Sequence, residues 1–185
     1  MLTLPRRLYV REPLKTIKPA LLRGVATVIV AHARLELLLT ELVYDLLRTD
    51  YMLGRQVLRG DNPPDIFNIA VRLIRVWDYK LAVNLSRLKK DIRKAYDKRN
   101  EVAHGAWVRM KRNDLRIRLV KDVRPTDAGD LDRRIIPEFA KRTLVTFKRD
   151  AKFINDVTAR VRLLQKQASI ELKAWPKTNV RRPPP

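Results

Sequence analysis

The sequence predicts a mainly α-helical protein: a bundle of four long helices with one small β-hairpin after the third helix. Three observations predict this fold. The 185 residues include only five glycines, most segments repeat apolar residues every three or four positions, and one segment alternates them every second position. Because 45% of the residues are hydrophobic and none is cysteine, the core must be held by apolar packing without disulfides.

This length favours one folded domain, and the proline positions indicate where it begins and ends. Residues 1–19 carry three prolines and several basic residues, which predicts an extended basic arm. Residues 173–185 close in Arg-Arg-Pro-Pro-Pro, which predicts a flexible tail. We therefore expect the helical domain at residues 20–172.

The first helix is expected over residues 20–48. Between Leu35 and Leu47, nine of thirteen positions are Leu, Val or Tyr, so apolar side chains nearly encircle the helix. A helix that is apolar on all sides is buried, either centrally in its own domain or against a second subunit.

The second and third helices have start and stop signals. The second is expected to begin at the run Asp61-Asn62-Pro63-Pro64 and to end near Trp77, because proline is favoured in a first helical turn. The third is expected over residues 81–103, with Gly105 as its stop. One apolar face marks it, formed by Leu85, Leu88, Ile92 and Tyr96.

The next segment changes period. Apolar and basic residues alternate over residues 107–120, which predicts a two-stranded hairpin turning at Asn113 and Asp114. This turn would place basic residues opposite one another, Arg109 with Arg118 and Lys111 with Arg116. Water or a bound phosphate backbone would neutralise these like charges, and the sequence leaves both possibilities open.

The last helix is expected to follow a polar connector at residues 121–136. Pro137 is well suited to be its first residue, and its apolar pattern continues to about Ala168.

The charge balance indicates the kind of partner. Lys and Arg number 41 against 20 Asp and Glu, a formal net charge of +21. Such a field attracts polyanions, above all nucleic acid, although a merely basic surface would have the same composition. The longest apolar run, residues 24–31, is far shorter than the ~20 residues of a membrane helix. The N-terminus lacks an apolar signal core, so we expect a cytoplasmic protein with no membrane partner.

Two histidines are present, and one of them closes the third helix beside an arginine. Arg99 continues the apolar face of that helix, so it should point inward or toward a partner, and His104 follows five residues later. Arginine and histidine without a metal suit RNA cleavage by transesterification. Histidine can take a proton from the 2′-hydroxyl or give one to the leaving 5′-oxygen, and arginine stabilises charge on the phosphoryl oxygens.

The run Arg99-Asn100-x-x-x-His104, with Ala103 before the histidine and Gly105 after it, resembles the signature of HEPN-domain ribonucleases. The resemblance implies a homodimeric helical bundle in which two Arg–His pairs share a cleft. It also implies metal-independent, cofactor-free endoribonuclease activity of the kind found in toxin–antitoxin and antiphage systems, where an antitoxin or other regulatory protein is a possible partner.

The same resemblance implies roles for single residues. Arg99 would engage the scissile phosphate, His104 would do the acid–base work and Asn100 would orient one of them. Many family members carry an acidic residue on an early helix near the site, and Glu36 is the candidate here. Basic residues around the motif are the candidates for RNA contacts: Lys98, Arg109, Lys111, Arg116 and Arg118.

Two questions stay open in the sequence. On an ideal helix, residues five positions apart are separated by about 140°, so Arg99 and His104 would meet through the reach of arginine, a distorted helix end or pairing across a dimer. His32 and Glu36 are one turn apart, and they form either a pair that steadies Arg99 or a local contact at a packing interface. The alternative functions are a non-catalytic HEPN-like module that binds RNA or protein, and a basic helical DNA-binding regulator.

Overall fold

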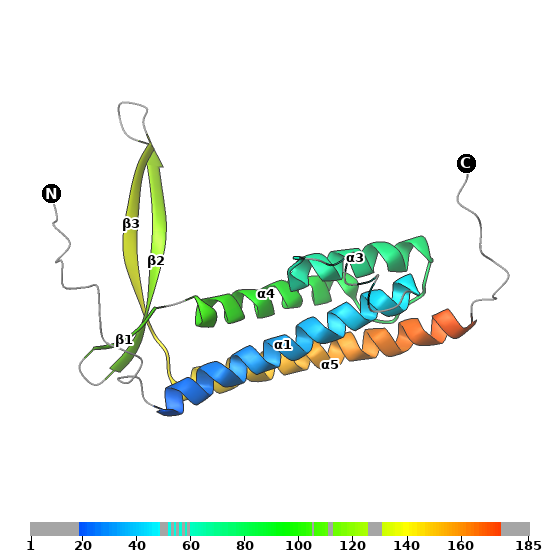
Figure 1. Cartoon of the computed structure of the whole chain (residues 1–185), viewed down its shortest axis with the longest axis horizontal. Helices are drawn as coiled ribbons and strands as arrows, with labels where there is room; N and C mark the ends of the chain where they lie inside the picture. Colours follow the sequence, from blue (N-terminus) through cyan, green and yellow to red (C-terminus); the bar gives the residue numbers. More distant parts are fainter. Residues whose placement is uncertain are drawn as a thin grey trace.

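The computed structural model confirms a mainly helical protein (Figure 1). It describes residues 19–48, 52, 54, 56, 58, 60–104, 106–110, 113–125 and 131–174, and between residues 106 and 141 it describes the backbone. The described part contains four helices of 14 residues or more: α1 (Pro19–Leu47), α3 (Pro63–Val76), α4 (Leu85–Ala103) and α5 (Leu144–Ala174).

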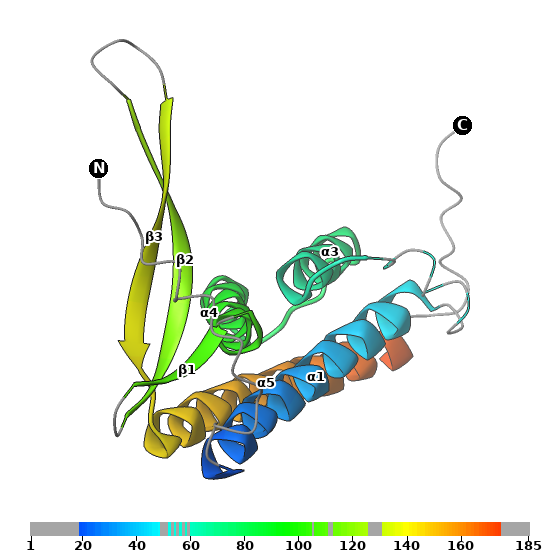
Figure 2. The ribbon, with the colours of Figure 1, turned by 60° about the vertical axis from the view of Figure 1, so that its left-hand side comes forward.

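The helices α1 and α5 form the long side of the bundle. They lie side by side and run in the same direction, while α4 runs the opposite way and α3 packs against α1 and α4 (Figures 1 and 2). Gly24 allows the close approach of α1 and α5, because a Cβ atom there would lie 2.8 Å from a ring carbon of Phe147. Because α4 packs against α5 and runs in the opposite direction, the last turns of α4 lie beside the beginning of α5.

The buried positions of α1 explain its apolar sequence. Leu35, Leu39, Leu42, Val43 and Leu46 are fully buried, because α1 packs against three other helices. The helix is thus buried centrally within one chain over much of its length. A row on its outer side, including Val30 and Leu37, is exposed.

Asparagine caps begin the two middle helices. The Asn62 side chain accepts a hydrogen bond from the backbone N–H of Asp65 at 3.3 Å, and the two prolines follow as expected. Asn84 accepts from the N–H of Arg87 at 2.9 Å, so α4 begins four residues later than its apolar pattern predicts. The C-terminal end of α4 is where the sequence places it, at Ala103.

Between α4 and α5 the backbone forms three antiparallel strands in the order β1-β2-β3: β1 (Ala106–Met110), β2 (Asn113–Pro125) and β3 (Leu131–Lys141). The strands β2 and β3 extend away from the helices as a long ribbon (Figure 2). This region differs from the expected two-stranded hairpin. Met110 is paired with Asn113, so the strands reverse direction before Asn113 rather than at Asn113 and Asp114.

The register also replaces the expected like-charge pairs. Arg109 lies opposite Asp114 and Arg118 lies opposite Glu138, so these two arginine positions each have an acidic position across the ladder. Acidic and basic positions across a ladder are favourable, whereas the pairs expected from a turn at Asn113 are not.

The prediction that Pro137 begins the last helix is wrong. Pro137 lies within β3, opposite Leu119, and β3 is an edge strand, where proline is tolerated. The helix α5 begins after Thr143 instead. The Thr143 hydroxyl accepts from the N–H of Thr146 at 3.3 Å, and the Thr146 hydroxyl accepts from the N–H of Thr143 at 3.0 Å. This reciprocal cap satisfies two backbone donors and sets the start of the helix.

The described helices reach slightly beyond the predicted domain of residues 20–172 at both ends. Of the expected arm at residues 1–19, the described part includes Pro19, which begins α1. Of the expected tail at residues 173–185, it includes Lys173 and Ala174, which end α5. No helix in the described part of the chain is long and apolar enough to cross a membrane.

Candidate functional site

The Arg–Asn–His motif lies at the C-terminal end of α4. His104 is the first residue beyond the helix, with φ −105° and ψ 1°, and its backbone N–H donates to the carbonyl oxygen of Asn100 at 3.0 Å. Nη1 of Arg99 lies 3.5 Å from Nε2 of His104 and donates to Oδ1 of Asn100 at 3.0 Å. The three motif side chains therefore meet within one chain, through the length of arginine and the end of the helix.

The motif is accessible from solvent. His104 is exposed, and Arg99 and Asn100 are half-buried. Two cavities of about 630 and 600 Å³ lie beside the first turns of α4, and neither includes a motif residue in its lining. The exposed His104 side chain is open to solvent, and an exposed motif suits a polymeric substrate better than it suits an enclosed small molecule.

The second histidine also lies close to Arg99. His32 on α1 is 3% exposed, and its ring centroid is 6.1 Å from that of Tyr96 on α4. Burial, together with the positive charge of Arg99, lowers the pKa of His32 from 6.5 to about 4. His32 is therefore neutral at pH 7. Both histidines of the sequence thus sit near one guanidinium group.

Glu36 forms no ion pair with Arg99 in the part of the chain that the structure describes. Its side chain is 48% exposed, and its Oε2 atom is 3.8 Å from Nδ1 of His32. Among the described residues, the ion pair that includes Glu36 is this one with His32, and none joins it to Arg99. The contact is therefore a local one between the buried His32 and the exposed Glu36, one turn apart on α1.

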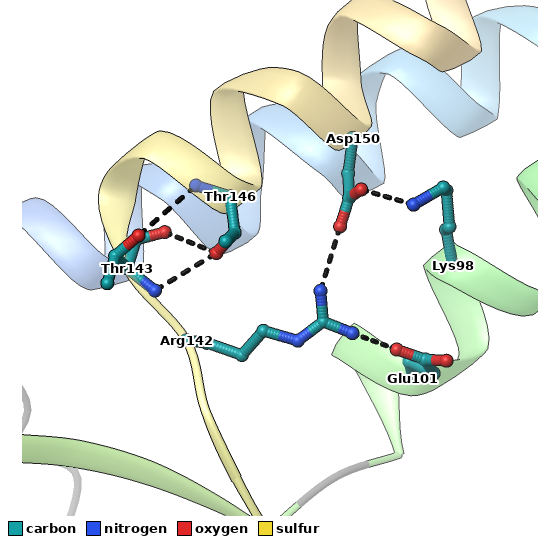
Figure 3. Close-up of polar contacts among 6 residues, drawn as sticks. All are labelled: Lys98, Glu101, Arg142, Thr143, Thr146 and Asp150. Atoms are coloured by element: carbon teal, nitrogen blue, oxygen red, sulfur yellow. Dashed lines mark hydrogen bonds and ion pairs between the residues drawn. The ribbon is translucent and has the colours of Figure 1, made fainter.

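A cluster of four charged residues holds the end of α4 against α5 (Figure 3). Asp150 on α5 is 1% exposed and accepts hydrogen bonds from Nζ of Lys98 and, at 3.1 Å, from Nη1 of Arg142. Nη2 of Arg142 donates to Oε2 of Glu101. We call these four residues the α4–α5 ion cluster.

The α4–α5 ion cluster changes the interpretation of Lys98. The sequence predicts Lys98 as an RNA contact, but its ammonium group is bound to the buried carboxylate of Asp150. A lysine held in this way serves the packing of two helices, since removing it would leave a buried charge unpaired.

Sequence reasoning missed Glu101, Arg142 and Asp150. One signal for them exists: Asp150 lies on the buried face of α5 that also carries Phe147, Ala151 and Ile154. An acidic residue on an apolar face needs a cation, and this pattern predicts a buried ion pair. The identity of its partners, 8 and 52 residues away, is not visible in any local pattern.

The other expected RNA contacts lie in the strand region. Arg109 belongs to β1, and Arg116 and Arg118 belong to β2, where the backbone is described. Lys111 lies outside the described residues. The strand β1 begins at Ala106, two residues after His104, so these positions follow the motif directly in the chain.

No group of three or more His, Asp or Glu side chains able to hold a metal ion occurs among the described residues. Comparisons with protein-family models, curated proteins and solved structures give no match to this chain.

Proposed function

We propose that this protein is a metal-independent endoribonuclease of HEPN type that cleaves RNA by transesterification. The observation that carries the proposal is the 3.5 Å contact between Arg99 and the exposed imidazole of His104. A cation and a proton-transfer group this close together can act on the same phosphodiester.

In the proposed reaction the RNA supplies its own nucleophile. The 2′-hydroxyl loses its proton and attacks the adjacent phosphorus, and the bond to the 5′-oxygen breaks as that oxygen gains a proton. The products are a 2′,3′-cyclic phosphate and a free 5′-hydroxyl. His104 moves the proton, Arg99 stabilises the negative charge on the phosphoryl oxygens, and Asn100 orients Arg99 through their 3.0 Å hydrogen bond.

The resemblance to HEPN ribonucleases implies a homodimer in which two such pairs share a cleft. One histidine would then take the proton and the other would give it. We propose the same assembly here, in a toxin–antitoxin or antiphage setting, where an antitoxin or another regulatory protein is a possible partner.

RNA would be held mainly through its phosphates. The net charge of +21 favours any polyanion. The outer side of α4 carries the exposed cations Lys89, Lys90, Arg93 and Lys94 ahead of the motif. Arg93 shares its charge with Asp97 at 3.3 Å, so the lysines are the stronger candidates for phosphate contacts.

A cleavage assay in EDTA tests the proposal. A structured RNA is incubated with the wild type, with His104→Ala and Arg99→Ala, and with the control Arg75→Ala, an exposed arginine on α3. We expect 2′,3′-cyclic phosphate ends from the wild type and the control and none from the two motif variants. RNA binding and thermal unfolding are measured in parallel. Failure of a folded wild type to cut several RNAs would leave a non-catalytic binding module as the better description.

A further inference from the structure

We propose that the α4–α5 ion cluster positions the catalytic motif: Arg142 and Asp150 fix the last turn of α4 so that Arg99 and His104 keep their mutual geometry. The structural part of this proposal concerns the orientation of two side chains. Its catalytic part rests on the proposed ribonuclease function.

The cluster holds α4 on both sides of the Arg99–Asn100 pair. Lys98 immediately precedes Arg99, and Glu101 immediately follows Asn100. Both are bound to groups outside α4, Lys98 to Asp150 and Glu101 to Arg142. Residues three apart lie on the same side of a helix, so these two attachments oppose rotation of the last turn about its axis.

The attachment comes from the point where the chain re-enters the helical bundle. The chain leaves the bundle after His104 to form the three strands, and it returns through Arg142 to α5. By reaching Glu101 and Asp150 together, Arg142 joins the departing and the returning segments (Figure 3). Movement of the strands relative to the bundle would otherwise be transmitted to His104, which lies two residues before the first strand.

The buried end of the cluster restricts the movement of its cations. Asp150 is 1% exposed, and its two carboxylate oxygens are bound to two different cations. If Lys98 or Arg142 moved away, a buried negative charge would be left only partly compensated. This would lower the stability of the fold, so both cations are held in place. Arg142 is 17% exposed and uses two of its nitrogens, which fixes the plane of the guanidinium group.

The test uses the small number of histidines. Because the chain has two, its imidazole NMR spectrum contains two sets of signals, and His104→Gln identifies which set is His104. The variants are Glu101→Gln, Arg142→Gln and the conservative Arg142→Lys. The matched control is Asp156→Asn, which breaks an exposed ion pair with Lys152 on the same helix, α5. Circular dichroism and thermal unfolding establish that each variant is folded, and Glu101→Gln, at the half-exposed end of the cluster, is the mildest change.

In Glu101→Gln and Arg142→Gln we expect displaced His104 imidazole signals. We expect these signals to be unchanged in Asp156→Asn and to return partly to their wild-type positions in Arg142→Lys. In the cleavage assay, we expect kcat to fall about tenfold or more with KM nearly unchanged, because misplacement of a catalytic group acts on the chemical step.

The two readouts separate the proposals. Displaced His104 signals in a protein whose wild type cuts no RNA would support the positioning role and reject the ribonuclease function. Unchanged His104 signals and unchanged kcat in folded Glu101→Gln and Arg142→Gln would overturn the positioning role, even where the wild type is an active ribonuclease.

Discussion

Nη1 of Arg99 lies 3.5 Å from Nε2 of His104, although the two residues are five positions apart and would face different sides of an ideal helix. The contact forms through the long arginine side chain and because His104 is the cap residue at which α4 ends. Gly105 follows, in agreement with the frequent use of glycine just after a helix. One chain thus assembles the pair without a second subunit, and a single phosphate can reach both groups.

Acid should destabilise the protein through His32. The pKa of His32 is about 4 in the folded protein and 6.5 as its ordinary value, so the unfolded chain binds the proton more readily. This contribution to stability is complete above pH 6.5, and it decreases as the pH falls from 6.5 toward 4. The full difference is about 3 kcal/mol.

Urea unfolding at several pH values between 7.5 and 4.5 measures this effect. We expect His32→Gln to lose most of the pH dependence in this window, and the matched variant His104→Gln, at the exposed histidine, to keep it. An unfolding free energy of His32→Gln that falls with pH as steeply as that of the wild type would contradict the burial of a neutral His32.

Replacing Asp150 should destabilise the fold much more than replacing a surface carboxylate. Asp150→Ala leaves Lys98 and Arg142 without their buried acceptor, and breaking a buried pair costs roughly 3–5 kcal/mol. Asp156→Ala removes an exposed pair with Lys152, for which the expected loss is below about 1 kcal/mol. Chemical denaturation of both variants gives the comparison, and equal losses would show that Asp150 is not buried in the ion cluster.

A side chain at position 24 should separate α1 from α5. In Gly24→Val, the Cβ atom alone would lie 2.8 Å from Cδ2 of Phe147, so the two helices have to move apart. Overpacking of this kind costs about 1–3 kcal/mol.

The combined variant Gly24→Val/Phe147→Leu tests the cause of this loss. We expect the double variant to lose less unfolding free energy than the sum of the losses in the two single variants, because the smaller leucine relieves the contact. Thr27→Val, at an exposed position of the same helix, controls for the helix propensity of valine. Strict additivity of the two substitutions would argue against the close approach at Gly24.

RNA binding should depend on salt through Lys89 and Lys90, and not through Lys98. Each phosphate contact that is removed lowers the slope of log K against log salt by about 0.7 for a single strand. We expect Lys89→Gln/Lys90→Gln to lower the slope, because both side chains are exposed.

Lys98→Gln provides the contrast for this measurement. It should leave the slope unchanged and lower stability instead, because Lys98 is paired with Asp150. Fluorescence anisotropy with a labelled RNA at four salt concentrations measures all slopes, and Lys152→Gln on α5 serves as the surface control. If Lys98→Gln lowers the slope as much as the double variant does, Lys98 contacts RNA and its assignment to helix packing is wrong.

Local sequence signals predicted most of the helical frame. The helix start at Asn62-Pro63-Pro64, the end of α4 at Ala103 and the span of α1 all agree with the structure, because caps, proline and the 3.6-residue period act within a few residues. The start of α5 was missed where two local signals competed. Pro137 has the fixed φ of a first helical turn, but the reciprocal cap of Thr143 and Thr146 satisfies backbone donors, and Pro137 lies in an edge strand.

The sequence by itself determined the helical class, the strongly basic charge and the placement of Arg99, Asn100 and His104 at a helix end, since these depend on composition and short-range periodicity. Only the tertiary structure decided how the charges around the motif are used. It brought His32 from α1 to Arg99, and it paired Lys98 with Asp150, 52 residues away. A local sequence pattern carries no information about such pairs. The pairing of buried charges depends on which helices pack together and on their relative position along the helix axes.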